Sequence, residues 1–470
     1  MVRALEAHAA ARPLRLCVPG HGGGAYRSPA LERALARHGV WALDWTEVPG
    51  LDDLAWPHGP IRAAEAALAE AFGAFGAAIL VGGSTAGILA TILAFGRGRD
   101  VALGPTQHRS VYAALALAGA RPLFLPERVD AATGLVLGLE PEAAARAITL
   151  GRPALVVALY PTYQGTAGRL TAVAEAAHAA GALVLADSAH GAHFGLDPRL
   201  PAPALSAGAD VAVLGLHKTL GALTQTALLA WREGVDGERL RAALRLLQSS
   251  SPSYPLMASA DSAGQDMARS GARRWRHALD RAERVRTLLG EELWRPRAEQ
   301  DPSRVYWLSP TGRGEDLFAS LRDAGCEPEY GDERGVLLLL GPNLGARDLG
   351  RLEAVVGQVR QRLAALPRGT QSPPGGGDRV RPAVPGHPDA MLDAMGASWQ
   401  AVPLAAAAGR TAADFLTPYP PGTPIALPGA RLDGRVLERV AAALAAGRQV
   451  QGVGPGSTIR VVRTEGGSPS

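Results

Sequence analysis

Seven short apolar runs alternate with stretches rich in Ala, Leu and Arg in the first half of the chain. The runs occupy residues 78–81, 101–103, 122–125, 155–159, 183–186, 211–214 and 227–230. Helical stretches, for example residues 171–180, lie between most of them. This alternation is typical of βαβ units, in which helices cover both faces of a mostly parallel sheet. The pattern therefore predicts a large α/β domain.

The remainder of the 470 residues predicts a multidomain chain. The expected units are an N-terminal arm and large domain at 1–258, a small α/β domain at 259–367, a linker at 368–382 and a C-terminal domain at 383–470. Within the small domain, the pattern predicts a helix at 273–289 and a strand at 335–340. The linker is predicted because it is rich in Pro, Gly and Ser.

Composition argues against several classes of protein. No basic run with interleaved aromatic residues accompanies the net charge of +4, so we expect no nucleic-acid partner. Cys17 and Cys326 have no metal-binding or disulfide-framework spacing, which fits a cytoplasmic protein without a bound metal. Residues 1–13 lack the apolar core of a signal peptide. The uncharged stretch 77–95 is long enough for a membrane helix, but Gly and Ser at its centre favour a strand, a loop and a helix.

Lys218 is the single lysine of the chain, whereas the other 47 Lys or Arg residues are arginine. Arginine replaces lysine in surface charge and ion pairs, but it does not replace a deprotonatable amine. A lysine that persists against this bias suggests a nucleophile, typically one that forms a Schiff base with a carbonyl or with pyridoxal phosphate (PLP). The alternative is that a rare residue occupies this position by chance. Lys218 directly follows the predicted strand 211–214, where open α/β sheets bind ligands.

Three further features complete the contacts that PLP requires. Asp187 ends the predicted strand 183–186 and is suited to pair with a protonated pyridine nitrogen, although a helix-capping role is equally compatible. The glycine-rich segment 82–87 lies between a strand and a helix, where backbone N–H groups bind phosphate. A nucleotide site there is less favoured, because the lysine of a P-loop is missing. His108 is either a ring-stacking residue or a structural histidine.

The chain resembles the ornithine/lysine/arginine decarboxylase family, in its short form, among fold type I PLP-dependent enzymes. The motifs that carry this resemblance occur in the family's order at 19–23, 82–87, 108–110, 161–165, 187–193, 217–220, 248–254 and 418–422. Each motif is modest alone, but the ordered set is specific. The resemblance implies an aspartate-aminotransferase-like large domain with a mostly parallel sheet, a smaller α/β segment and a small C-terminal domain.

The same resemblance assigns a role to each candidate residue. It implies Lys218 as the Schiff-base lysine and Asp187 as the partner of the pyridine nitrogen, with His108 stacked on the ring. The other implied cofactor contacts are Ser84, Thr85 and His217 at the phosphate, and Ala189 and His190 along the remaining face. Segments 249–254 and 19–24 are expected near the active site of a homodimer or higher homo-oligomer.

Three positions depart from the family pattern. Gly215 stands where a hydroxyl residue is common, which removes one expected phosphate contact. Gly22 stands where lysine is common. Ala430 replaces an acidic residue after the C-terminal Pro-Gly, and that acid is a candidate for substrate recognition. Asp414 is a candidate carboxylate for a guanidinium group in its place.

The resemblance implies decarboxylation of a basic amino acid, with arginine favoured over lysine and ornithine, to give CO2 and agmatine or a diamine for polyamine synthesis. Lys218, His190 and His217 are alternative donors of the proton that Cα receives. Two other functions stay open. One is a different fold type I reaction, such as that of an aminotransferase or lyase, and the other is a non-catalytic PLP-binding homologue.

Overall fold

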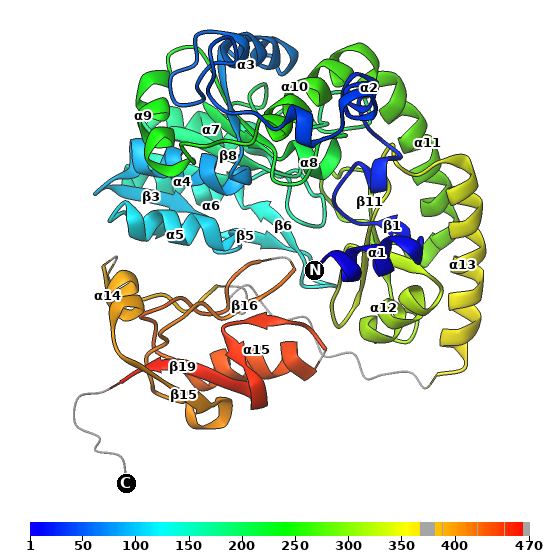
Figure 1. Cartoon of the computed structure of the whole chain (residues 1–470). Coiled ribbons are helices and arrows are strands. Elements are labelled where there is room, and N and C mark those ends of the chain that lie inside the picture. Colours follow the sequence, from blue (N-terminus) through cyan, green and yellow to red (C-terminus); the bar gives the residue numbers. More distant parts are fainter. Residues whose placement is uncertain (367–380, 388, 421, 446, 464–470) are drawn as a thin grey trace.

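A seven-stranded sheet forms the centre of the large domain (Figure 1). The structure is a computed structural model that describes residues 1–366, 381–387, 389–420, 422–445 and 447–463. In spatial order the strands are β2 (Gly76–Leu80), β10 (Ala227–Trp231), β9 (Val211–Leu214), β8 (Leu183–Ser188), β7 (Leu155–Leu159), β3 (Asp100–Leu103) and β4 (Arg121–Phe124). All seven predicted strands are therefore present, each within two residues of its expected bounds.

The sheet is parallel except at β10, which runs antiparallel to both β2 and β9. The pairs β9–β8, β8–β7, β7–β3 and β3–β4 are all parallel. Consequently β2, β3, β7, β8 and β9 all end at one edge of the sheet. The antiparallel β10 was not predicted, because its apolar composition carries no information on strand direction.

Helices cover both faces of the sheet, as predicted. Alternate strand residues enter the two separate cores, since Ile79 belongs to one and Leu80 to the other. One face is covered by α3 (Pro60–Ala71), α6 (Pro141–Gly151), α7 (Leu170–Ala179) and α10 (Tyr254–Asp266). The opposite face is covered by α4 (Gly83–Gly96), α5 (Arg109–Leu117) and α9 (Gly237–Leu247). Among the described residues, no helix is long and apolar enough to cross a membrane.

The second α/β unit contains a three-stranded antiparallel sheet. Its strands are β11 (Arg304–Leu308), β14 (Gly335–Leu339) and β13 (Tyr330–Gly331), and its helices are α11 (Ala272–Leu289), α12 (Gly314–Asp323) and α13 (Ala346–Ala364). The predicted helix and strand correspond to α11 and β14. The N-terminal strand β1 (Leu14–Leu16) joins this unit, because it pairs in parallel with β12 (Cys326–Pro328) and its leucines enter the same core.

The proposed boundary between residues 258 and 259 lies inside α10. Met257 before it and Ala260 after it both belong to the core beneath the seven-stranded sheet. The division of the chain into domains therefore stays a prediction, and the continuous core extends past residue 258. Residues 368–380 of the predicted linker lie outside the described residues.

The C-terminal domain packs beside α5 and the hairpin of β5 (Glu127–Val129) and β6 (Val136–Leu139) (Figure 1). Its elements are α14 (Ala390–Gly396), β15 (Trp399–Pro403), β16 (Thr417–Pro418), α15 (Gly434–Ala445), β17 (Val450–Gln451), β18 (Val453–Gly454) and β19 (Thr458–Val462). Met391 and Leu427 enter one core of the large domain. The guanidinium of Arg109 donates to Gln451 Oε1 at 2.8 Å, and its backbone N–H donates to Gly422 O at 2.9 Å.

Candidate active site

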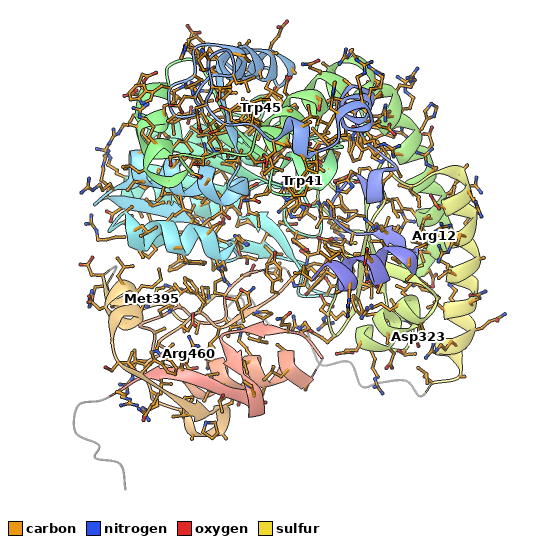
Figure 2. The ribbon with its side chains drawn as sticks, viewed as in Figure 1. Arg12, Trp41, Trp45, Asp323, Met395 and Arg460 are labelled. Atoms are coloured by element: carbon orange, nitrogen blue, oxygen red, sulfur yellow. The ribbon has the colours of Figure 1, made fainter. Side chains whose placement is uncertain are left out.

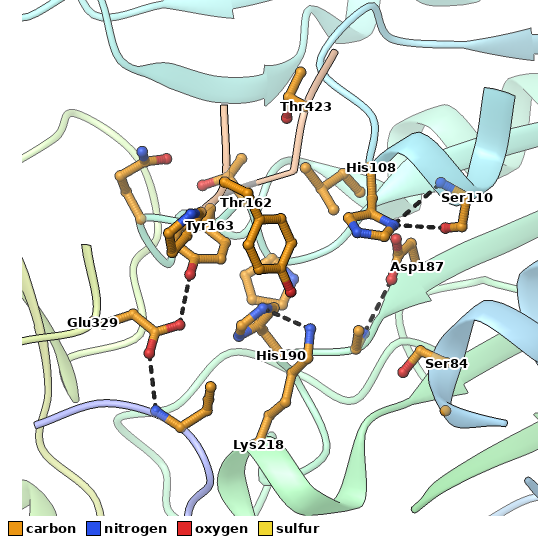
Figure 3. A pocket seen from close by; sticks show the side chains of 18 of the residues that line it. Ser84, His108, Ser110, Thr162, Tyr163, Asp187, His190, Lys218, Glu329 and Thr423 are labelled. Carbon is orange, nitrogen blue, oxygen red and sulfur yellow. Dashed lines mark hydrogen bonds between the residues drawn. The ribbon is translucent and has the colours of Figure 1, made fainter. Parts of the chain in front are cut away.

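A cavity of about 860 Å³ lies where the parallel strands end (Figure 3). The loops after these strands bring distant parts of the sequence together, as expected of open α/β sheets. The eight residues predicted to form the site all line this cavity, namely Ser84, Thr85, His108, Asp187, Ala189, His190, His217 and Lys218. The N-terminal segment, the small domain and the C-terminal domain supply other walls.

Lys218 lies on the short helix α8 (Leu216–Thr219), immediately after β9. Its Nζ lies 2.9 Å from His190 Nε2. Burial lowers the pKa of the Lys218 ammonium, although the negative charges of Asp187 and Glu329 oppose this shift. A lowered pKa increases the fraction of neutral amine, which is the form that attacks a carbonyl carbon.

Arg304 determines which nitrogen of His190 carries the proton. Arg304 is 1% exposed on β11, and its Nη2 contacts His190 Nδ1. Because a guanidinium only donates, Nδ1 accepts, and the proton of the neutral imidazole is on Nε2, facing Lys218 Nζ. Burial first, then the charges of Lys218 and Arg304, lower the pKa of His190 well below its usual range. A neutral His190 that donates to Nζ is consistent with a neutral Lys218 amine.

Asp187 is the buried carboxylate of the site. It is the penultimate residue of β8, and its Oδ1 accepts a hydrogen bond from Ala189 N–H at 3.2 Å. Burial raises the pKa of Asp187, while the charge of Lys218 and the Ala189 N–H oppose this shift. No ion pair joins Asp187 to a basic side chain among the described residues. A buried carboxylate of this kind requires a cationic partner to remain ionised.

The turn between β2 and α4 supplies an anion-binding arrangement. Gly83 has φ +70°, a conformation that favours glycine, and it begins α4. Ser84 Oγ is buried and has no hydrogen-bond partner within the described structure. A buried hydroxyl without a hydrogen-bond partner destabilises the fold unless a ligand supplies the missing hydrogen bond. Ser84 and Thr85 at the helix N-terminus therefore fit a phosphate group.

His108 has two structural relationships. It is the N-cap of α5, where its Nδ1 accepts from Ser110 N–H at 3.2 Å and lies 2.8 Å from Ser110 Oγ. It also lines the cavity, against Gly422 of the C-terminal domain. Burial lowers the pKa of His108 to about 4, so its ring is neutral. The capping and stacking interpretations are therefore compatible with each other.

A hydrogen bond to the backbone limits how His217 could bind the phosphate. Its Nδ1 lies 2.7 Å from Thr226 O and donates to it. In a neutral ring Nε2 then has no proton, and burial lowers the pKa of His217 to about 4. His217 therefore donates to a phosphate only as an imidazolium, a form that the charge of a phosphate would stabilise.

Two family profiles match this chain. The profile described as the Orn/Lys/Arg decarboxylase major domain matches residues 1–303, and the one described as the C-terminal domain matches residues 382–456. The chain belongs to the Orn/Lys/Arg decarboxylase family. It is a PLP-dependent amino-acid decarboxylase, with the mixed α/β fold predicted from its sequence.

Relatives of this family align over nearly the whole chain. A protein named arginine decarboxylase from Bacillus subtilis is 31% identical over 98% of this chain and 96% of its own length. A second, from Halalkalibacterium halodurans, is 31% identical over 97% of this chain and 96% of its own length. The solved constitutive lysine decarboxylase of E. coli has a TM-score of 0.72 at 20% identity, covering 98% of this chain and 81% of that one, which shows the shared fold.

The residues of the cavity fit the family's cofactor. Lys218 offers a buried amine of lowered pKa, and Asp187 offers a buried carboxylate that forms no ion pair with any described residue. Ser84 offers the hydroxyl without a partner at a helix N-terminus. These three features match the aldehyde, ring nitrogen and phosphate of PLP, and the individual roles stay predictions.

The family departure at Gly215 has a steric explanation. A Cβ at this position would lie 2.4 Å from Ala189 O, so this backbone leaves no room for the hydroxyl residue common in the family. Ala430 is buried at 0% exposure, and it does not line the cavity. Asp414 was one candidate for a substitute carboxylate, and it does not line the cavity of this chain either. Its carboxylate instead lies 3.6 Å from Arg460 Nη1.

The two segments expected near the site differ in position. Pro19 lines the cavity, and Gly20 N–H donates to His217 O at 2.8 Å, so the N-terminal arm contacts the site of its own chain. By contrast, residues 249–254 do not line the cavity of this chain, and Tyr254 Oη donates to Asp52 O at 2.6 Å. Whether the latter segment reaches the site of a second subunit stays a prediction.

Sequence reasoning missed Glu329 and Arg304. Glu329 lines the cavity from the small domain, whereas Arg304 supports His190 from behind. Neither lies in one of the motifs that carry the family resemblance. The single available signal for Arg304 was an arginine at the start of an apolar strand, where a charged side chain needs a partner. Tyr163 lay within a recognised motif, but its contact with Glu329 depends on the fold.

Proposed function

We propose that this enzyme decarboxylates arginine to agmatine and CO2. The observation that carries the proposal is a cavity with Lys218, Asp187 and Ser84 in a chain that aligns over 98% of its length with a protein named arginine decarboxylase. The proposal extends to a cytoplasmic homodimer that supplies polyamine synthesis. Lysine and ornithine are the other basic amino acids that the family name allows.

The side chains have distinct roles in the proposed reaction. When bound, PLP supplies an electron sink for the electron pair of the breaking Cα–carboxylate bond. Asp187 keeps the ring nitrogen protonated, because a buried carboxylate stabilises an adjacent cation. Lys218 presents its neutral amine, and His190 Nε2–H orients that amine at 2.9 Å. The bond electrons left by CO2 finally form a Cα–H bond with a transferred proton.

The hydrogen bonds narrow the choice of proton donor. His217 directs its Nδ1–H at Thr226 O, and the Nε2–H of an imidazolium would be donated to the phosphate, so neither proton is available to Cα. His190 has Nε2–H directed at Lys218 Nζ. We therefore favour Lys218 or His190 over His217 as the donor to Cα.

An assay of the holoenzyme with arginine, lysine and ornithine tests the proposal. We expect stoichiometric CO2 and agmatine from arginine, measured by isotopic CO2 release and by chromatography of the amine. A keto acid in place of the amine would indicate an aminotransferase. A bound-PLP absorbance without turnover of any basic amino acid would indicate a non-catalytic homologue. Either result would contradict the proposal.

A further inference from the structure

Glu329 is a carboxylate in the cavity wall that forms no ion pair with any residue the structure describes. The cavity lining contains two carboxylates among the described residues, Asp187 and Glu329. Asp187 is assigned to the cofactor ring, so Glu329 is left without a role. It is 8% exposed, and no ion pair joins it to a basic side chain in the described parts of the chain. Buried charges in proteins are usually paired, which suggests that the cation comes from the substrate.

Three separate segments hold this carboxylate in place. Tyr163 Oη, after β7, donates to Oε1 at 2.6 Å. Val18 N–H, after β1, donates to Oε2 at 2.9 Å. The backbone N–H of Glu329 donates to Leu337 O at 3.0 Å. The side chain is thus pre-organised before any ligand binds, which reduces the entropy lost on binding.

The hydrogen bonds leave room for a bidentate ligand. Each carboxylate oxygen accepts one hydrogen bond, whereas an ionised carboxylate offers about four acceptor positions in total. One position therefore remains on each oxygen. A planar guanidinium donates to both oxygens of a carboxylate at once, whereas an ammonium acts as a point charge.

The position of Glu329 suits the distal end of a substrate. In Figure 3, Glu329 and Ser84 lie on opposite sides of Lys218. The phosphate end of the cofactor is assigned to Ser84 and the reactive carbon to Lys218, so Glu329 is across from the phosphate. The negative charge of Glu329 repels the α-carboxylate of a substrate and attracts a cationic side chain.

We propose that Glu329 is the specificity-determining residue that binds the guanidinium of arginine. This inference rests on the proposed function, and it assigns recognition to Glu329 in place of the candidate Asp414 and of the acidic residue that Ala430 replaces. Ala430 has no charge, and Asp414 lies outside the cavity beside Arg460. Glu329 thereby supplies from the small domain the negative charge that position 430 lacks.

The test compares Glu329→Gln with wild type in the holoenzyme. Citrulline has a side chain of the same shape as that of arginine but without its charge. The ratio of kcat/KM for arginine to that for citrulline therefore measures recognition of the side-chain charge. We expect this ratio to fall at least roughly tenfold, because one partner of a buried charge pair is lost. Calorimetric titration with agmatine should give a Kd that is raised at least about tenfold.

Glu327→Gln is the matched control. Glu327 lies two residues away on β12, pairs with Arg322 at 3.4 Å and does not line the cavity. We expect its arginine-to-citrulline ratio and agmatine affinity to equal those of wild type. If Glu329→Gln behaves like this control while wild type releases CO2 from arginine, the inference is wrong and the proposed function stands. Wild type that decarboxylates no basic amino acid would instead refute the proposed function.

A second variant covers the case in which Glu329→Gln does not yield folded holoenzyme. Glu329→Asp keeps the charge but withdraws it from the cavity by one methylene group. We expect the arginine-to-citrulline ratio to fall about threefold or more, because bidentate pairing depends on geometry. An unchanged ratio and an unchanged agmatine Kd in this variant would overturn the inference.

Discussion

At the scale of single residues, burial first, and then a chain of hydrogen bonds, sets the protonation state of the Lys218 amine. Arg304 donates to His190, and His190 in turn donates to Lys218. The charge of Arg304 also lowers the pKa of Lys218. The amine therefore depends on a guanidinium that does not line the cavity.

Arg304→Met tests this chain of hydrogen bonds. Removing the cation raises the pKa of Lys218, so the neutral amine becomes available only at higher pH. We expect the pH midpoint for PLP capture by apoenzyme, followed by absorbance, to move upward. Turnover at neutral pH should fall roughly a hundredfold, the lower end of the range for lost acid–base catalysis. A midpoint equal to that of wild type would contradict this role.

At the scale of elements, the chemistry depends on the turns that follow strands. The turn after β2 requires glycine at position 83, and the turn after β9 requires Gly215 to pass close to Ala189. Gly83 lines the cavity itself, whereas Gly215 lets its backbone pass close to that of Ala189, which lines the cavity. Ser84 is then placed at the N-terminus of α4 with its hydroxyl buried.

Ser84→Ala separates cofactor binding from folding. In apoenzyme the hydroxyl has no partner, so its removal should leave the free energy of unfolding unchanged or raise it by about 1 kcal/mol. In holoenzyme a hydrogen bond to phosphate is lost, so PLP affinity should fall about tenfold or more. Thermal unfolding of apoenzyme and equilibrium dialysis of PLP measure the two effects. Destabilised apoenzyme with unchanged PLP affinity would contradict the assignment.

The sequence predicted these elements well where the signal was local. Apolar runs such as 155–159 gave the strands, and the position of Lys218 after β9 gave the edge of the sheet that holds the cavity. The pairing of β1 with β12 was not predicted, because it joins segments about 300 residues apart. Glu329 was missed for the same reason, since its partners Val18 and Tyr163 are distant in sequence.

At the scale of the whole molecule, three parts of the chain enclose one site. Tyr419, Pro420 and Thr423 line the cavity from the C-terminal domain, and Glu329 lines it from the small domain. Cores are also shared, because Leu427 packs with the large domain. The site is therefore completed only when the domains pack together.

An exposed apolar segment supports the proposed homodimer. Trp41 is 88% exposed, Trp45 58% and Trp56 62%, and Figure 2 shows the first two on the N-terminal segment. Exposed large apolar residues in one segment are typical of protein interfaces. We expect the double variant Trp41→Ser and Trp45→Ser to shift the mass measured by light scattering toward the monomer. Leu150→Ser, at a position 86% exposed on α6, is the control and should not change the mass. A double variant with the wild-type mass would contradict an interface at this segment.

The central claim is that Lys218 forms the covalent link to PLP, and borohydride reduction of holoenzyme tests it most directly. Because Lys218 is the single lysine, reduction should fix the cofactor on one tryptic peptide, residues 200–232, with cleavage after Lys218 blocked. We also predict that Lys218→Arg loses both the label and turnover. Label on any other peptide, or turnover retained by Lys218→Arg, would contradict the account.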